Sequence, residues 1–141
     1  MKIYPDSSFL FSRYLTDAHS QDVDRRMNKL QHLIVTPFHS AELANAIFQW
    51  VFRGIISDAD ARHAYADFQK DCSTGVLTVT HQPAQTYQTA IRLAEQHVAR
   101  LGVRTLDSLH VASALELKAD AFWTFDRRQA GLAEAEGLRT S

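Results

Sequence analysis

Short apolar runs alternate with longer amphipathic stretches along this chain. Runs with the length and bounding residues of strands lie at residues 2–5, 33–36, 76–80 and 121–125. Apolar residues at three- and four-residue steps, together with residues that start or end helices, predict helices at residues 6–15, 20–32, 39–52, 58–74, 83–101, 105–117 and 127–136. Strands that alternate with helices in this way are typical of a parallel sheet covered by helices on both faces.

The predicted helix 105–117 illustrates how the core is read from the pattern. Its inner stripe comprises Leu106, Leu109, Ala112, Ser113 and Leu117. Residues at this spacing share one face of a helix, so we expect Leu106 and its companions to face the core.

The composition is that of an ordinary soluble domain. The 141 residues include 15 basic and 16 acidic side chains, which gives a formal net charge of −1. This balance argues against a protein that coats nucleic acid indiscriminately, so any contact with nucleic acid has to be local. A chain of this length can build one hydrophobic core, and without an internal repeat or a linker we expect a single domain over residues 1–141.

Several classes of protein are disfavoured by what the sequence lacks. Cys72 is the only cysteine, which excludes an internal disulfide and a CxxC zinc site and fits a reducing compartment. No apolar run approaches the ~18 residues of a membrane span, and the start MKIYPDSS is unlike a signal peptide. We therefore expect a cytoplasmic chain. The motifs GxGxxG, GxxxxGK, HExxH and GxSxG do not occur either, which disfavours the corresponding nucleotide, zinc-protease and serine-hydrolase sites.

Four acidic residues follow strands or open helices in the predicted fold. Asp6 and Asp126 come directly after strands, Glu42 lies near the start of the helix after the second strand, and Asp107 opens a later helix. Ligands of open parallel sheets bind outside the carboxyl ends of the strands, so we expect these acids to converge there. Each one alone is also explained structurally, since Asp is a favoured N-cap and Glu42 suits a solvated first turn.

Together, the four acids indicate a metal site. Carboxylates that lie close together repel one another unless a cation is bound among them. A set of oxygen ligands without cysteine or an obligatory histidine favours Mg²⁺ or Mn²⁺ over zinc or copper. Such a site is suited to phosphodiester hydrolysis.

The segments YPDSSFL, HSAELANA, RTLDSLHVASA and FWTFDRRQ, in this order, resemble the PIN-domain ribonucleases, specifically the VapC-type toxins of prokaryotic toxin–antitoxin pairs. The resemblance implies a three-layer α/β/α sandwich with a mostly parallel sheet and Mg²⁺- or Mn²⁺-dependent endoribonuclease activity on RNA. It also implies neutralisation by a cognate antitoxin protein. The acidic site of the family maps onto Asp6, Glu42, Asp107 and Asp126. Thr124 falls where such proteins often have a site hydroxyl, so we expect it to contact the substrate. Because the chain stops at Ser141, we expect the last edge strand, at 138–140, to be short or absent.

Other side chains near these acids have both a functional and a structural reading. Ser7 and Arg127 could contact a substrate phosphate, as could Arg104 and Arg128, but a serine at a helix start also caps it and surface arginines also pair with acids. Asn45 lies three residues after Glu42 and could hydrogen-bond to it. His110 follows Asp107 by the same interval, and its apolar neighbours favour a packing or supporting role over catalysis.

The chain holds more large apolar side chains at 9–14 and 47–52 than one side of each helix can bury. A surplus of this kind predicts an exposed interface, which by the resemblance would be a homodimer contact or an antitoxin groove. The main alternative function is a catalytically silent PIN-like module that binds RNA or protein. A haloacid-dehalogenase-type phosphatase fits poorly, because Asp6 is followed by Ser7 and Ser8 rather than by the DxD motif. A receiver domain fits poorly because the sequence lacks its paired acids and the lysine at the end of a late strand.

Overall fold

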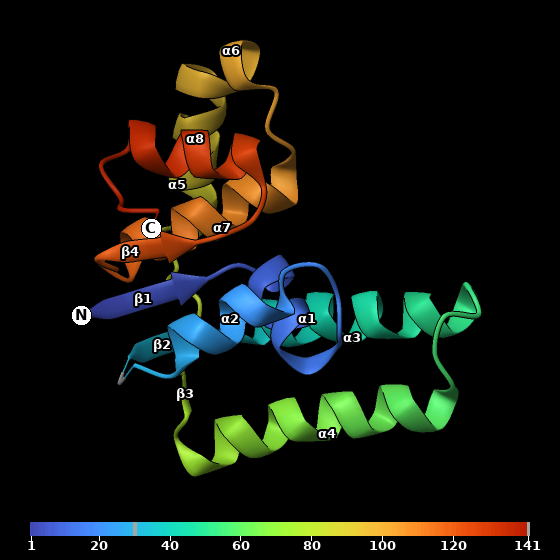
Figure 1. Cartoon of the computed structure of the whole chain (residues 1–141). Coiled ribbons are helices and arrows are strands. Elements are labelled where there is room, and N and C mark those ends of the chain that lie inside the picture. Colours follow the sequence, from blue (N-terminus) through green and yellow to red (C-terminus); the bar gives the residue numbers. More distant parts are fainter. Residues whose placement is uncertain (30, 141) are drawn as a thin grey trace.

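The structure is a computed structural model that describes residues 1–29 and 31–140 (Figure 1). Leu30, which falls within the predicted helix 20–32, and Ser141 lie outside the described residues. The elements in chain order are β1 (Lys2–Pro5), α1 (Ser7–Tyr14), α2 (Ser20–Met27), β2 (His32–Val35), α3 (Pro37–Phe52), α4 (Asp58–Thr74), β3 (Leu77–Val79), α5 (Thr86–Leu93), the π-helical turn η1 (Ala94–Val98), α6 (Ala99–Leu101), α7 (Thr105–Glu116), β4 (Ala121–Trp123) and α8 (Arg127–Ala135).

The four strands form one parallel sheet in the order β3-β2-β1-β4. Strand β1 is central, with Ile3 paired to Leu33 of β2 on one side and to Ala121 of β4 on the other. The chain therefore builds the sheet outward from β1 through β2 to β3, and then returns to place β4 on the opposite side of β1.

Each face of the sheet has its own hydrophobic core. Ile3 and Trp123 pack into one core with residues of α1 to α4, whereas Tyr4 and Phe122 pack into the other with residues of α5, α7 and α8. Figure 1 shows the two groups of helices on opposite sides of the strands. The alternation of side chains along β1 and β4 thus produces the three layers, and the predicted α/β/α sandwich with a parallel sheet is confirmed.

The start of α3 differs from the prediction because of its capping residues. The helix begins at Pro37 rather than at His39, with proline in the first turn, where its missing N–H costs nothing. The backbone N–H of Thr36 donates to Nδ1 of His39 at 2.9 Å, and Nε2 of His39 donates to the carbonyl oxygen of Pro5 at 2.7 Å. His39 therefore joins the start of α3 to the end of β1, and its burial lowers its pKa to about 3.

Several predicted boundaries are also shifted. The strand predicted at 121–125 ends at Trp123, and the helix predicted at 83–101 begins at Thr86, while its end at Leu101, reached through η1 and α6, is as predicted. At the C-terminal end, Arg139 makes an isolated parallel bridge with Ala121, so the expected edge strand is reduced to one bridge. Of the helices within residues 1–29 and 31–140, none has the length and apolarity of a membrane span.

The prediction that Leu106 faces the core is wrong. Its side chain is 50% exposed, while Leu109 and Ala112 of the same helix are buried. Leu106 is the second residue of α7, and this first turn extends beyond the sheet to the rim of a cleft. The periodic pattern places residues on a helical face but does not say where along the helix the core ends.

Candidate active site

The sheet order creates a crevice at the carboxyl ends of β1 and β4. At this point the chain connections leave in opposite directions, which is where open α/β sheets bind ligands. The backbone N–H of Asp6 donates to the carbonyl oxygen of Trp123 at 2.9 Å and joins the two strand ends. A cleft of about 830 Å³ lies here, and its walls include Asp6, Glu42, Asp107 and Asp126. The structure thus brings the four predicted acids to one cleft.

Asp6 is held by four hydrogen bonds and is only 4% exposed. Its carboxylate accepts hydrogen bonds from the Ser8 hydroxyl at 2.7 and 2.9 Å, from the Phe9 backbone N–H at 2.9 Å and from the Thr124 hydroxyl at 2.6 Å. The bond to Phe9 makes Asp6 the N-cap of α1. Burial raises the pKa of Asp6, while these hydrogen bonds oppose the shift.

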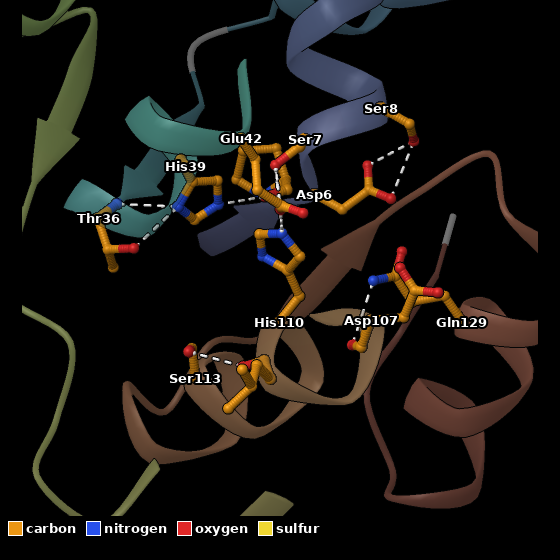
Figure 2. Close-up of polar contacts among 12 residues, drawn as sticks. Asp6, Ser7, Ser8, Thr36, His39, Glu42, Asp107, His110, Ser113 and Gln129 are labelled. Carbon is orange, nitrogen blue, oxygen red and sulfur yellow. Dashed lines mark hydrogen bonds and ion pairs between the residues drawn. The ribbon is translucent and has the colours of Figure 1, made fainter. Parts of the chain in front are cut away.

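Glu42 belongs to a hydrogen-bonded chain that runs into the second core. Its Oε1 accepts a hydrogen bond from the Ser7 hydroxyl at 2.7 Å and another from Nε2 of His110. The Tyr4 hydroxyl lies 2.9 Å from Nδ1 of His110. Since Nε2 carries the proton toward the carboxylate, Nδ1 accepts from Tyr4. Figure 2 shows Ser7, Glu42 and His110 directed toward one another. Burial raises the pKa of Glu42, but the contacts with His110 and Ser7 outweigh it and lower the pKa overall.

His110 is therefore a part of the site that the sequence analysis left undecided between packing and support. The residue is 2% exposed, and its ring stacks on Phe38 with centroids 4.4 Å apart. It lies in the same buried aromatic group as Tyr4 and His39. The signal in the sequence was its spacing of three residues from Asp107, which puts both side chains on the same side of α7.

Asp107 and Asp126 have fewer protein partners for their carboxylates. Oδ1 of Asp126 accepts from the Gln129 backbone N–H at 2.9 Å, which makes this exposed residue the N-cap of α8. Asp107 is partly buried, and no side-chain hydrogen bond to its carboxylate is found among the described residues. Burial raises the pKa of Asp107, and so do the negative charges of Asp126, Asp6 and Glu42, against the opposing effect of His110. The four acids are thus close enough to act on one another electrostatically.

Gln129, which the sequence analysis did not single out, connects these acids. It is 1% exposed, and its amide donates to the backbone oxygen of Asp107 at 3.2 Å (Figure 2). The Thr124 hydroxyl lies 2.9 Å from the Gln129 side-chain oxygen and 2.6 Å from Asp6. A sequence signal was present, because Gln129 lies three residues after Asp126 in FWTFDRRQ, at the position an N-cap contacts.

The remaining candidates divide between the cleft and its surroundings. Ser7 and Asn45 line the cleft, but no hydrogen bond joins Asn45 to Glu42 in the part of the chain that the structure describes. Thr124 is absent from the described walls of this cleft, and its hydroxyl instead contacts Asp6. Arg127 is exposed and lines an adjoining cleft.

The residues of the cleft fit a divalent cation. Within residues 1–29 and 31–140, no three His, Cys, Asp or Glu side chains already stand in the positions of a metal site. The chemistry of the donors is nevertheless suitable, because the four acids present only oxygen ligands. In the same described residues, no lysine or arginine forms an ion pair with any of the four. Burial and the charges of the other three acids raise the pKa of Asp107, and His110 is the group that opposes this shift, so no lysine or arginine of these residues offsets the repulsion.

Comparison with known proteins supports the interpretation of the fold. Among curated proteins, no relative matches this chain. The solved structure of VapC20 from Mycobacterium tuberculosis, described as a sarcin-ricin-loop-cleaving toxin, is similar with a TM-score of 0.72 and 18% identity. The match covers 99% of this chain and 98% of that one.

Two further structures have the same fold. VapBC-1 from nontypeable Haemophilus influenzae gives a TM-score of 0.70 at 16% identity, with 100% of this chain and 97% of that chain covered. FitAcB from Neisseria gonorrhoeae gives 0.66 at 10% identity, with 98% and 95% covered. The family model described as the PIN domain matches residues 3–135, nearly the whole chain. The family indicated by the four motifs is thereby confirmed, and the chain belongs to the PIN-domain family.

Proposed function

We propose that this chain is a metal-dependent endoribonuclease that hydrolyses RNA phosphodiester bonds and acts as the toxin of a toxin–antitoxin pair. The observation that carries the proposal is the convergence of Asp6, Glu42, Asp107 and Asp126 on one cleft at the switch point of the sheet. Burial raises the pKa of Asp107, and the other three carboxylates raise it further. A fold gains no stability from such repulsion, whereas a cation site requires it.

The four carboxylates would hold Mg²⁺ or Mn²⁺, because oxygen donors favour these hard cations over softer metals. When bound, the ion supplies positive charge to the phosphate and lowers the pKa of a water molecule. The protein supplies orientation. Ser8, Phe9 and Thr124 fix the carboxylate of Asp6, while His110, supported by Tyr4, fixes that of Glu42.

Substrate contacts are assigned to groups that reach the clefts. Ser7 lines the acidic cleft, so its hydroxyl can contact RNA as well as Glu42. Arg127 lies at the rim, where a guanidinium group pairs well with phosphate. Thr124 acts on the substrate only through Asp6, because its hydroxyl is directed to that carboxylate.

The biological role rests on the relatives. VapC20 is described as a toxin that cleaves the sarcin-ricin loop, and other similar structures are VapBC and FitAcB assemblies. We extend this role to the present chain: one domain over residues 1–141, in the cytoplasm, inhibited by a cognate antitoxin protein and active as a homodimer. The alternative, a silent module that binds RNA or protein, would leave the repulsive acids without a purpose.

The proposal is tested by incubating purified protein with structured RNAs in Mg²⁺ or Mn²⁺, with and without EDTA. Cleavage is expected only with the metal, and it should be lost in Asp6→Asn. Asp60→Asn is a matched control, because Asp60 is an exposed acid in the first turn of α4, outside the cleft. Cleavage that persists in EDTA and in Asp6→Asn would contradict the metal mechanism.

The toxin role needs its own experiment. Expression of the chain alone in its host should arrest growth, and co-expression of the neighbouring gene product should restore it. Growth unaffected by the active chain would exclude the toxin role, while leaving the nuclease activity in place.

A further inference from the structure

A second cleft opens directly from the acidic one. It has a volume of about 540 Å³ and shares Asp107, Phe125 and Asp126 with the first cleft. Its other described walls are Gly102, Val103, Arg104, Arg127 and Arg128. The shared wall at Phe125 is fixed, because this ring stacks on His19 with centroids 4.1 Å apart and on Phe9 at 5.8 Å. A polymer strand bound over the acids would reach this second pocket, where three arginines join Asp107 and Asp126.

The three arginines of this pocket, Arg104, Arg127 and Arg128, are exposed. Among the described residues, none of their guanidinium groups forms a hydrogen bond or ion pair, although Asp107 and Asp126 line the same pocket. Arginines elsewhere on the surface behave differently: Arg62 pairs with Asp58 at 2.7 Å and Arg92 with Glu136 at 2.8 Å. The guanidinium groups beside the site are thus available to an anion that is not part of this chain.

Phosphate is the anion that this arrangement fits best. Guanidinium groups bind phosphate oxygens through two parallel hydrogen bonds, and three of them around one pocket concentrate positive charge on a protein whose net charge is only −1. The neighbouring acids would repel a carboxylate or phosphate placed over them unless a metal ion intervened. Asp107 and Asp126 also line the arginine pocket, but its three guanidinium groups outnumber these two carboxylates, so phosphate binding there does not require that ion.

We propose that the pocket formed by Arg104, Arg127 and Arg128 is a metal-independent binding site for a backbone phosphate of RNA, next to the phosphate that is cleaved. This inference rests on the proposed nuclease function and deepens it by dividing the substrate site into two parts. The acids and their cation act on the reacting phosphate. The arginines hold a neighbouring phosphate of the same strand and so fix the strand in the cleft.

The test measures binding without metal. A short fluorescein-labelled single-stranded RNA is titrated with the full chain in EDTA, and binding is followed by fluorescence anisotropy over a range of salt concentrations. The triple variant Arg104→Gln/Arg127→Gln/Arg128→Gln should bind at least about tenfold more weakly. The slope of log affinity against log salt should fall by about 0.7 for each phosphate contact removed.

Two further variants sharpen the comparison. Arg139→Gln is the matched control, because Arg139 is exposed and lies outside both clefts, and its affinity should change less than about twofold. Asp107→Asn removes a negative charge from the wall shared by the clefts and should strengthen binding in EDTA, although it abolishes cleavage. Circular dichroism and thermal melting confirm that each variant is folded.

The outcomes separate this inference from the nuclease proposal. If RNA is cleaved in Mn²⁺ but the triple variant keeps wild-type affinity and salt slope, the arginine site is refuted and the nuclease stands. If no RNA is cleaved but binding in EDTA depends on the three arginines, the arginine site stands and the nuclease proposal is refuted. A triple variant that binds RNA normally but loses an acidic partner protein would assign the pocket to that partner, which also overturns the inference.

Discussion

Asp6 and Glu42 are each held by several protein donors, whereas the carboxylate of Asp107 has none among the described residues and that of Asp126 has the backbone of Gln129. The first pair lies at the ends of β1 and in α3, close to both cores. The second pair lies at the starts of α7 and α8, nearer to solvent. The carboxylates of Asp6 and Glu42 thus have their hydrogen-bond partners within the protein, whereas those of Asp107 and Asp126 lack a positively charged partner among the described residues.

This difference separates acids whose contacts stabilise the fold from an acid whose charge destabilises it. The bonds to Asp6 and Glu42 contribute to stability and orientation at once. Burial raises the pKa of both Asp6 and Asp107, but hydrogen bonds oppose the shift at Asp6, whereas three other negative charges add to it at Asp107. Substitutions on the two sides should therefore affect activity alike and stability in opposite directions.

The largest effect is expected on activity, and it should not distinguish the two sides. Asp107→Asn and Asp6→Asn should each lower kcat/KM for RNA cleavage by at least about 10²-fold, the size of loss typical when a group that stabilises reacting charge is removed. The rates are measured with a labelled RNA at saturating Mn²⁺. Near-normal cleavage by Asp107→Asn would show that the solvent side of the cleft is not part of the site.

A smaller loss is expected when the support of Glu42 is removed. His110→Ala deletes the hydrogen bond to the carboxylate, and residues that orient metal ligands typically contribute 10- to 100-fold. The apparent Mn²⁺ affinity, measured by isothermal titration calorimetry, should weaken by a similar factor. A matched substitution is His63→Ala, an exposed histidine of α4. If His110→Ala loses stability only, with unchanged Mn²⁺ affinity, its role is packing.

His39 allows a test of how firmly the core side of the cleft is tied together. Its pKa is about 3 in the fold against about 6.5 for a free histidine, so between these values the unfolded chain binds a proton that the folded chain does not. The free energy of unfolding should therefore fall as pH decreases below about 6.5, by about 1.4 kcal/mol per pH unit at pH 5. Urea denaturation at several pH values measures the free energy of unfolding of the wild type and of His39→Gln. The decrease with falling pH that is due to His39 should be absent from the variant.

The smallest effect concerns stability, and it tests directly whether substitutions on the two sides change the free energy of unfolding in opposite directions. Without metal, Asp107→Asn should raise the free energy of unfolding by about 0.5 kcal/mol, since solvent screening reduces the repulsion at this partly buried position. Asp6→Ala should lower it by about 1 to 2 kcal/mol through loss of the N-cap. Both are measured by urea denaturation in EDTA. Equal destabilisation by the two variants would remove the proposed difference between the sides.

The sequence predicted those parts of the site that depend on local rules. Asp6 and Asp126 could be placed because strand ends and helix starts are marked by neighbouring residues, and the parallel topology then brings them to one edge. The acid set could also be transferred from the motifs of the family. The fold followed from the same alternation of strands and helices, apart from boundaries set by capping, as at Pro37.

Contacts between distant segments could not be predicted. His110 and Glu42 are separated by 68 positions, and Tyr4 and His110 by 106. Their bonds depend on how α3 and α7 meet at β1, which no local pattern encodes. The exposure of Leu106 was missed for the same reason, because the length of the core along α7 is set by the neighbouring sheet.

Strand β1 spans only Lys2–Pro5, yet its register decides more than pairing. Tyr4 contacts His110, and Asp6, two residues later, accepts from Thr124. One residue inserted or deleted between Tyr4 and Asp6 would turn one of these two side chains away from its partner, while the apolar content of the strand would hardly change. A chain in which β1 is shifted by one residue in register would keep much of its buried apolar area but would lack activity. The register of these four residues thus determines whether the catalytic residues reach their positions.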